Sequence, residues 1–204
     1  MKNKIEPQPI STKNHQYADR LISLQSTWWK EKFFFLNPYL VHVRIITRGR
    51  VLEVGSGIGR NLRVLRQGSL GVDHNKFAVE YARKKKLSSL TVNDFFTKSR
   101  KVRSVFDTLL LSHVLEHVDS ETQEQIFDQF IPFLASGAKI VLICPQEAGF
   151  VTDKTHIRWV NESMLRDILE SLGCRAIKVK SFPFPRRAGK KFKYNQTVAT
   201  GFLL

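Results

Sequence analysis

From residue 50 onward, short runs of β-forming hydrophobic residues alternate with helical patterns of apolar residues, and Gly, Asn or Asp separates them. This alternation is typical of repeated βα units on a mainly parallel sheet. We expect strands over seven segments: Val51–Val54, Gly71–Asp73, Leu90–Val92, Phe106–Ser112, Lys139–Cys144, Ala176–Val179 and Thr197–Leu203. The pattern therefore predicts an α/β fold.

Several of the intervening helices have recognisable ends. Ser120 followed by Gln123 forms a capping box, which predicts a helix that stops near Gly137. Gly173 is expected to supply the left-handed stop of a later helix. The other expected N-cap residues are Asn75 and Asn161.

Residues 1–49 do not follow this alternation, so we expect an N-terminal tail and helical cap over 1–49 and one domain over 50–204. A helical pattern covers Tyr17–Phe35, and Asn37-Pro38 is typical of an N-cap and first-turn proline of a second helix ending near Gly49. The aromatic cluster around Trp29 is interpreted first as a packing surface. Because it can also form a lid over a site, Trp29 is a candidate acceptor contact.

Composition narrows the class of protein. The 204 residues carry a formal charge of +15, and successive blocks (1–50, 51–100, 101–150 and 151–204) have net charges of +6, +6, −4 and +7. A basic chain favours phosphate-bearing or acidic partners, so nucleic acid stays an open alternative. No apolar run is long enough to cross a bilayer, and the basic start lacks the hydrophobic centre of a secretory signal. Two cysteines favour a reducing cytoplasm.

The most specific motif is a glycine-rich turn directly after the first strand, Glu53-Val54-Gly55-Ser56-Gly57-Ile58-Gly59. We expect a helix of little more than two turns after it, because the gap from Gly59 to Asp73 is short. Glycines let a backbone turn sharply and approach a ligand closely. The dinucleotide-binding fingerprint requires a glycine where this chain has Arg60, so a hydride-transferring dehydrogenase fits poorly.

The pattern E-x-G-x-G-x-G resembles motif I of the class I S-adenosylmethionine-dependent methyltransferases, and the resemblance extends over about residues 40–204. It implies a Rossmann-like, seven-stranded, mainly parallel sheet whose last strand is antiparallel. It also implies S-adenosylmethionine as cofactor and S-adenosylhomocysteine as product. In this family the motif acid, here Glu53, helps to hold the methionine ammonium group.

Further matches follow at the ends of the next strands. The resemblance gives Asp73 the ribose hydroxyls, Asp94 the adenine amino group and Phe95 a place over the adenine ring. Carboxyl ends of adjacent parallel strands are where ligands bind in open α/β sheets. The expected cofactor-binding residues are Glu53, Gly55, Ser56, Gly57, Gly59, Asp73, His74, Asp94, Phe95 and Ser112.

Three histidines are candidate catalytic residues, because an acceptor hydroxyl must lose a proton and a neutral imidazole titrates near working pH. These are His113, His117 and His156. A helical turn would place His113, Glu116 and His117 on one face, with His156 on the same sheet edge.

The same residues are similar to the divalent-ion ligands of the ubiquinone-pathway O-methyltransferases and the small-RNA 2′-O-methyltransferases. His113 stands where those enzymes have Glu, which argues against magnesium because magnesium prefers oxygen ligands. The primary prediction is therefore no metal, with His113, Glu116, His117 and His156 as the alternative ligand set. Acceptor contact and purely structural hydrogen bonding are the other interpretations of these residues.

A basic loop over 182–194 is expected at the cofactor edge of the sheet. Arg186 and Arg187 are candidates to bind a carboxylate or phosphate of the acceptor, although a solvated charge run gives the same pattern. We therefore expect an enzyme that methylates an anionic small molecule, with O-methylation favoured. An RNA methyltransferase and a non-catalytic S-adenosylmethionine-binding regulator are the alternatives.

Overall fold

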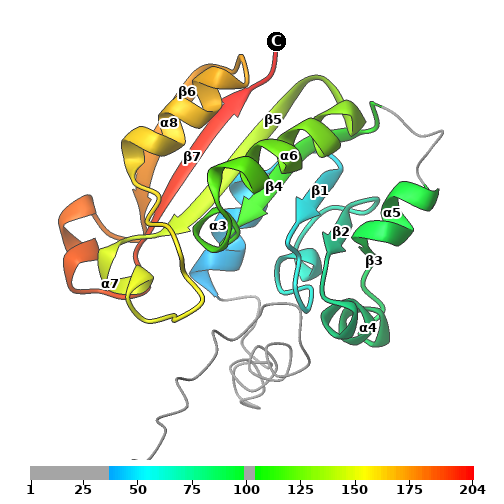
Figure 1. The fold of residues 1–204 in the computed structure, drawn as a ribbon, viewed down its shortest axis with the longest axis horizontal. Helices are drawn as coiled ribbons and strands as arrows, with labels where there is room; N and C mark the ends of the chain where they lie inside the picture. The colour runs from blue at the N-terminus through cyan, green and yellow to red at the C-terminus, as the bar shows by residue number, and fades with distance from the viewer. Residues whose placement is uncertain (1–36, 99–103) are drawn as a thin grey trace, which may run out of the picture.

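The computed structural model describes residues 37–98 and 104–204, and in this part the strands form one seven-stranded sheet (Figure 1). The strand order is β3-β2-β1-β4-β5-β7-β6. The strands are β1 (Val51–Val54), β2 (Leu70–Asp73), β3 (Ser89–Thr91), β4 (Phe106–Ser112), β5 (Leu134–Pro145), β6 (Arg175–Phe182) and β7 (Gln196–Phe202). Strands β1 to β5 pair in parallel, whereas β7 is antiparallel to both β5 and β6. The predicted fold class is confirmed, including the antiparallel last strand.

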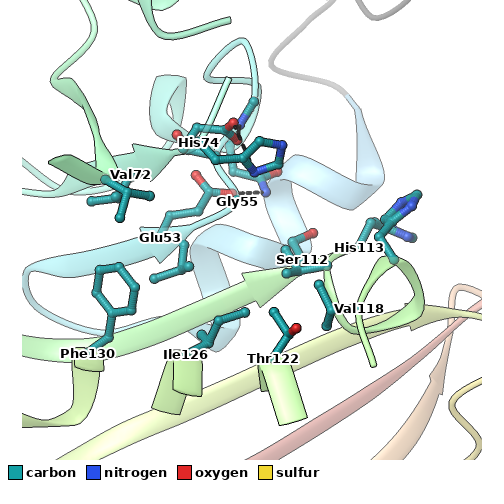
Figure 2. A pocket seen from close by; sticks show the side chains of 18 of the residues that line it. Glu53, Gly55, Val72, His74, Ser112, His113, Val118, Thr122, Ile126 and Phe130 are labelled. Atoms are coloured by element: carbon teal, nitrogen blue, oxygen red, sulfur yellow. Dashed lines mark hydrogen bonds and ion pairs between the residues drawn. The ribbon is translucent and has the colours of Figure 1, made fainter. Parts of the chain in front are cut away.

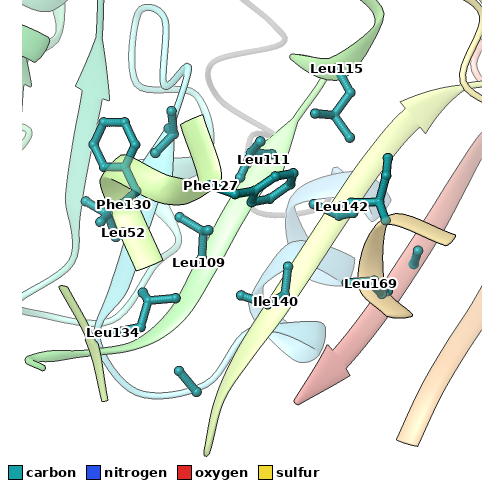
Figure 3. Close-up of a cluster of buried hydrophobic side chains, with 14 of the residues drawn as sticks. Leu52, Leu109, Leu111, Leu115, Phe127, Phe130, Leu134, Ile140, Leu142 and Leu169 are labelled. Atoms are coloured by element: carbon teal, nitrogen blue, oxygen red, sulfur yellow. The ribbon is translucent and has the colours of Figure 1, made fainter. Parts of the chain in front are cut away.

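The central strands are buried on both faces, which explains their nearly continuous apolar sequences. The larger core lies under α5 (Val92–Lys98), α6 (Ser120–Phe130) and α8 (Glu162–Ser171), where Leu111, Phe127 and Leu142 pack together (Figure 3). The other face carries α3 (Pro38–Ile46), whose Val43 packs on a smaller core. The other α-helices within residues 37–98 and 104–204 are α4 (Lys76–Lys84) and α7 (Glu147–Phe150). None of the described helices could span a membrane.

Most predicted helix ends are confirmed. The side chains of Asn37, Asn75 and Asn161 each accept a hydrogen bond from the backbone of the helix that follows. Gly173 has φ of +72°, the left-handed stop expected after α8.

Three local predictions were wrong. The N-cap of α6 is Asp119, whose side chain accepts from the Thr122 amide, so the capping box at Ser120 does not form. This helix ends at Phe130, and Gly137 lies inside β5, where its φ of +66° marks an irregular strand start. Finally, the glycine loop is followed by a 3-10 turn over Asn61–Arg63 and not by a helix of about two turns, because few residues separate β1 from β2.

The topology fixes where a ligand can bind. Strand β1 lies between β2 and β4, so the chain leaves β1 toward one side of the sheet and later returns to the other. Such a switch point opens a crevice at the carboxyl ends of the strands. Because β6 runs in the same direction as β5, the loop after β6 reaches this edge too, as predicted.

Candidate functional site

A cavity of about 720 Å³ lies at the switch point (Figure 2). Its walls come from the glycine loop, the ends of β2 and β4, the turn after β4, the inner side of α6 and the segment after α7. This volume falls in the range of small-molecule sites. The cavity therefore gathers residues that the sequence predicted from separate motifs.

The glycine loop forms the part of the wall that side chains would obstruct. Gly55, Gly57 and Gly59 all have positive φ, at +75°, +51° and +80°. A Cβ atom on Gly55 would collide with the Val114 side chain, and one on Gly59 would lie 2.6 Å from Leu87 Cδ1. Gly55 lines the cavity, whereas Gly59 shapes the loop from behind and does not belong to the cavity lining.

Asp73 closes β2 and is held by backbone amides on both oxygens. Gly57 N–H donates to Oδ2 and Asn75 N–H donates to Oδ1, each at 2.7 Å. Each carboxylate oxygen retains a lone pair, so the carboxylate can still accept hydrogen bonds from a ligand. His74, next in the chain, is half exposed, with Nδ1 3.9 Å from the Asp73 carboxylate.

Glu53 is the second buried carboxyl group of the cavity. Asn61 Nδ2 donates to its Oε1 at 2.6 Å, but Oε2 has no partner and is shielded from solvent. Burial raises the pKa of Glu53 to about 8, with the Asp73 charge adding to the effect and the Asn61 hydrogen bond opposing it. A buried acceptor without a partner suits a cationic ligand group, which would restore the ionised form.

An apolar wall faces these carboxyl groups. Val72, Val92, Ile126 and Phe130 contribute to it, and Figure 2 shows Ile126 and Phe130 reaching toward the loop from α6. Such a wall can cover the faces of a planar ring. The sequence did not indicate Ile126 and Phe130 as site residues, since the position of α6 over the cavity depends on tertiary packing.

The residues predicted to hold adenine lie elsewhere. Phe95 is fully buried in the core, with its ring 4.7 Å from that of Phe133, and does not line the cavity. Asp94 is half-exposed on α5 and pairs with Arg83 at 3.2 Å. Helix α5 begins immediately after β3, which turns both side chains away from the cavity. Ser112, at the end of β4, lines the cavity.

His117 has a defined tautomer. Its Nδ1 lies 3.1 Å from the carbonyl oxygen of Thr155, which can only accept, so Nδ1 carries the proton and Nε2 offers a lone pair. Burial lowers the pKa of His117, and the nearby Glu116 charge only partly offsets this effect. His117 is therefore a neutral imidazole at the cavity wall, which is the state that a general base requires.

His156 and Glu116 complete a three-residue cluster with His117. His156 Nδ1 lies 2.6 Å from the Phe150 carbonyl oxygen, which again leaves Nε2 with the lone pair, and the two imidazole rings are 4.7 Å apart. Glu116 is buried and its Oε2 has no partner. Ligand atoms of the three residues lie within 4.8 Å of one another, so the cluster could hold a divalent ion.

His113 lies outside this cluster. It has a positive φ of +58°, and its ring bridges Glu116 Oε1 at 3.1 Å and Gln196 Oε1 at 3.2 Å. Burial opposes ionisation of Glu116, but the hydrogen bond and charge of His113 outweigh it and hold the Glu116 pKa below its usual value. The predicted helical turn does not form, because the chain after β4 makes only a 3-10 turn over Leu115–His117.

The two arginines of the basic loop that were candidates to bind the acceptor do not lie at the cavity wall. Arg186 pairs with both oxygens of Glu147, at 2.6 and 2.7 Å, and its Nε lies 3.1 Å from Glu162. Its guanidinium is therefore used to fix the loop. Arg187 is exposed, and neither arginine lines the cavity. Trp29 lies outside the described residues.

The charges around the cavity are mostly negative. Four carboxyl groups and one arginine line it, and the sequence did not mark Asp119, Asp153 or Arg60 as site residues. The sequence signal that could have indicated a negative cavity was the acidic block over 101–150, which contains Asp119. A cavity of this kind suits a ligand with positive charge.

Comparison with known proteins identifies the domain. Residues 41–179 match a family model described as a methyltransferase domain. No curated protein was found to match the chain.

The fold is similar to several solved structures. One is a SAM-dependent methyltransferase from Archaeoglobus fulgidus, with 19% identity, a TM-score of 0.67 and coverage of 91% of this chain and 99% of that one. A second is a possible histamine N-methyltransferase from Thermotoga maritima, with 17% identity, a TM-score of 0.66 and coverage of 92% and 98%. A third is magnesium protoporphyrin IX methyltransferase from Synechocystis PCC 6803 with SAH bound, with 14% identity, a TM-score of 0.62 and coverage of 95% and 96%.

Proposed function

Because this chain belongs to the methyltransferase domain family, with S-adenosylmethionine as its cofactor, we propose that it methylates a hydroxyl group of an anionic small molecule. The observation that supports this proposal is the neutral His117 at the cavity wall, whose Nδ1 is engaged by the Thr155 carbonyl so that its Nε2 carries a free lone pair. A hydroxyl acceptor needs such a base, whereas a stronger nucleophile does not.

The cavity residues fit the cofactor. The unpartnered Oε2 of Glu53 suits its ammonium group, the carboxylate of Asp73 can accept from ribose hydroxyls, and the surface of Gly55 leaves room for close contact. The apolar wall from Val92, Ile126 and Phe130 suits adenine.

The bound cofactor supplies an electrophilic methyl group on a sulfonium, whose sulfur is a good leaving group. The work left to the protein is to align the acceptor with the methyl group and to exclude water. His117 Nε2 takes the proton of the acceptor hydroxyl, and Thr155 keeps the ring in the required tautomer. The deprotonated oxygen would then accept the methyl group, with the thioether of S-adenosylhomocysteine as the leaving group.

Recognition of the acceptor's negative charge falls to Arg187 in this proposal, because Arg186 is occupied by Glu147 and Glu162. The experiment that identifies the acceptor is a screen with methyl-labelled cofactor against acidic metabolites and RNA fractions. Label in an acidic metabolite supports the proposal. Label in RNA alone indicates an RNA methyltransferase, and binding without any transfer indicates a regulatory protein.

Replacement of the base tests the mechanism. We expect His117→Ala to lower kcat about 10²- to 10⁴-fold on the identified acceptor while cofactor affinity stays unchanged. The wild-type rate should fall as pH decreases through the lowered pKa of His117, since only the neutral ring accepts a proton.

His113→Asn is the matched comparison, because Asn tolerates the left-handed backbone at that position. It should retain most of the rate. A larger loss in this variant than in His117→Ala would contradict the assignment of the base. Loss of wild-type activity with a strong chelator would instead assign Glu116, His117 and His156 to a metal ion.

A further inference from the structure

Large hydrophobic side chains are exposed on two neighbouring loops at the cofactor edge of the sheet. One loop follows α7 and the other follows β6 (Figure 1). The exposed fractions are 78% for Val151, 66% for Ile157, 42% for Trp159, 52% for Phe184 and 58% for Tyr194. Exposed apolar groups that gather in one region usually mark an interaction surface.

The second loop packs against α7, from which the first loop leaves, and the first loop reaches the cavity. A Cβ atom on Gly149 of α7 would lie 2.5 Å from the Lys193 carbonyl oxygen, so α7 packs tightly against the second loop. The Phe150 ring stacks on His156 with centroids 5.2 Å apart, and His156 and Ile157 both line the cavity. Ile157, one of the exposed apolar residues, therefore lies at the cavity, and the second loop lies beside the first across α7.

The second loop is held rigidly although its aromatic residues are exposed. Arg186 ties it to Glu147 and Glu162, and Asn195 donates to Gln146 Oε1 at 2.8 Å and accepts from the Phe184 amide at 3.0 Å. The rings of Phe184, Phe192 and Tyr194 pack edge to face, with centroids 5.3 and 5.6 Å apart. A fixed loop keeps its apolar groups presented to solvent at little entropic cost on binding.

Positive charge surrounds these apolar groups. From Arg175 to Leu204 the sequence contains eight Lys and Arg residues and no Asp or Glu. Four of these cations are exposed on the second loop: Arg187, Lys190, Lys191 and Lys193. Lys193 Nζ lies 5.0 Å from the centre of the Tyr194 ring. Aromatic rings with flanking Lys and Arg are typical of groups that lie at a membrane interface.

We propose that the loops over 151–159 and 184–194 dock the protein on an anionic lipid surface, so that the cavity opens toward the bilayer and the acceptor is an amphiphile with its hydroxyl at headgroup level. This inference rests on the proposed function for the identity of the acceptor. Single-stranded RNA fits less well, because stacking and phosphate contacts leave no role for Val151 and Ile157. A protein partner fits less well because lysine is depleted at the centres of protein interfaces.

Vesicle binding of the full chain tests the proposal. We expect binding to vesicles of phosphatidylcholine with phosphatidylglycerol, weak binding to phosphatidylcholine alone, and a decrease with added salt. Lys190→Ala with Lys191→Ala should weaken binding about 25-fold, at about fivefold per cation. The control pair, Lys84→Ala with Lys85→Ala at the end of α4, is equally exposed and should leave binding unchanged.

A second matched pair of variants tests the exposed apolar residues of the proposed docking surface. Val151→Ser should weaken vesicle binding several-fold, whereas Ile45→Ser, 71% exposed on α3 on the other face of the sheet, should not. Calorimetric affinity for S-adenosylmethionine should be the same in all these variants, which shows that they fold.

Three outcomes would overturn the inference: equal binding to neutral and anionic vesicles, equal losses in test and control variants, or binding to single-stranded RNA without binding to vesicles. Methyl transfer to a water-soluble acceptor without vesicle binding would overturn the docking surface and leave the proposed function intact. Vesicle binding without any methyl transfer would overturn the proposed function and leave the docking surface intact.

Discussion

Glu53 carries the clearest electrostatic signature in the cavity. Its burial and its unpartnered Oε2 leave the carboxyl group protonated below about pH 8. An ammonium group beside Oε2 would favour the ionised form of Glu53. Cofactor binding should therefore release a proton whenever the pH lies below the pKa of Glu53 in the cofactor-free protein.

We therefore expect affinity for S-adenosylmethionine to rise with pH, by up to about tenfold per unit, and to level off above about pH 8. The affinity rises with pH because the pKa of Glu53 is raised. The protonated Glu53 that dominates at low pH must lose its proton to bind the ammonium group. Calorimetry in buffers of different ionisation enthalpy measures the proton release. Glu53→Gln should bind more weakly and without pH dependence, and an unchanged pH slope in that variant would contradict the role given to Glu53.

At the residue scale, positions at the cavity could be predicted where a strand ends, but not where tertiary packing decides which way a side chain faces. Glu53, Gly55 and Asp73 follow or close buried strands, and the sequence shows the strands. The partners of Arg186 could not be predicted, since Glu147 and Glu162 lie on two other helices. The burial of Phe95 in the core could not be predicted, because an aromatic residue after a strand can face either the crevice or the core.

At the scale of elements, the strands were predicted well because buried parallel strands have continuous apolar sequences. Bounds of β1 and β4 agree with the prediction to the residue. The start of β5 was missed, since Gly137 interrupts its apolar run, and the predicted helix after the glycine loop shortens to a 3-10 turn. Both errors lie at irregular segments, where local periodicity is absent.

The glycine loop allows a matched test of its geometry. Gly55→Ala and Gly137→Ala both place a Cβ at positive φ, so each should lose about 1 kcal/mol of unfolding free energy. Only the Gly55 variant also collides with Val114, whereas nothing lies within 4 Å at Gly137. We expect Gly55→Ala to lose S-adenosylmethionine binding and Gly137→Ala to retain it, as calorimetry would measure. Equal binding by the two variants would show that the loop surface is not a ligand contact.

For the molecule as a whole, the charge of +15 divides into two regions of opposite character. Carboxyl groups dominate the cavity, which suits a sulfonium donor, while lysines and arginines gather on the loop after β6. This separation lets one protein bind a cationic cofactor and approach an anionic surface without direct competition between the two.

Cofactor binding at the switch point should stabilise the whole domain, because only the folded state assembles the cavity from distant segments. At a concentration of 100 times Kd, S-adenosylmethionine should add about 2.7 kcal/mol to the unfolding free energy and raise Tm by about 5–11 °C. Asp73→Ala removes the acceptor of two loop amides and the predicted ribose contact, so most of the ligand-induced shift should disappear. Asp94→Ala removes a half-exposed carboxylate outside the cavity and should keep the full shift. If thermal unfolding showed the reverse, adenine would lie against α5, and the apolar wall from α6 would not be its binding site.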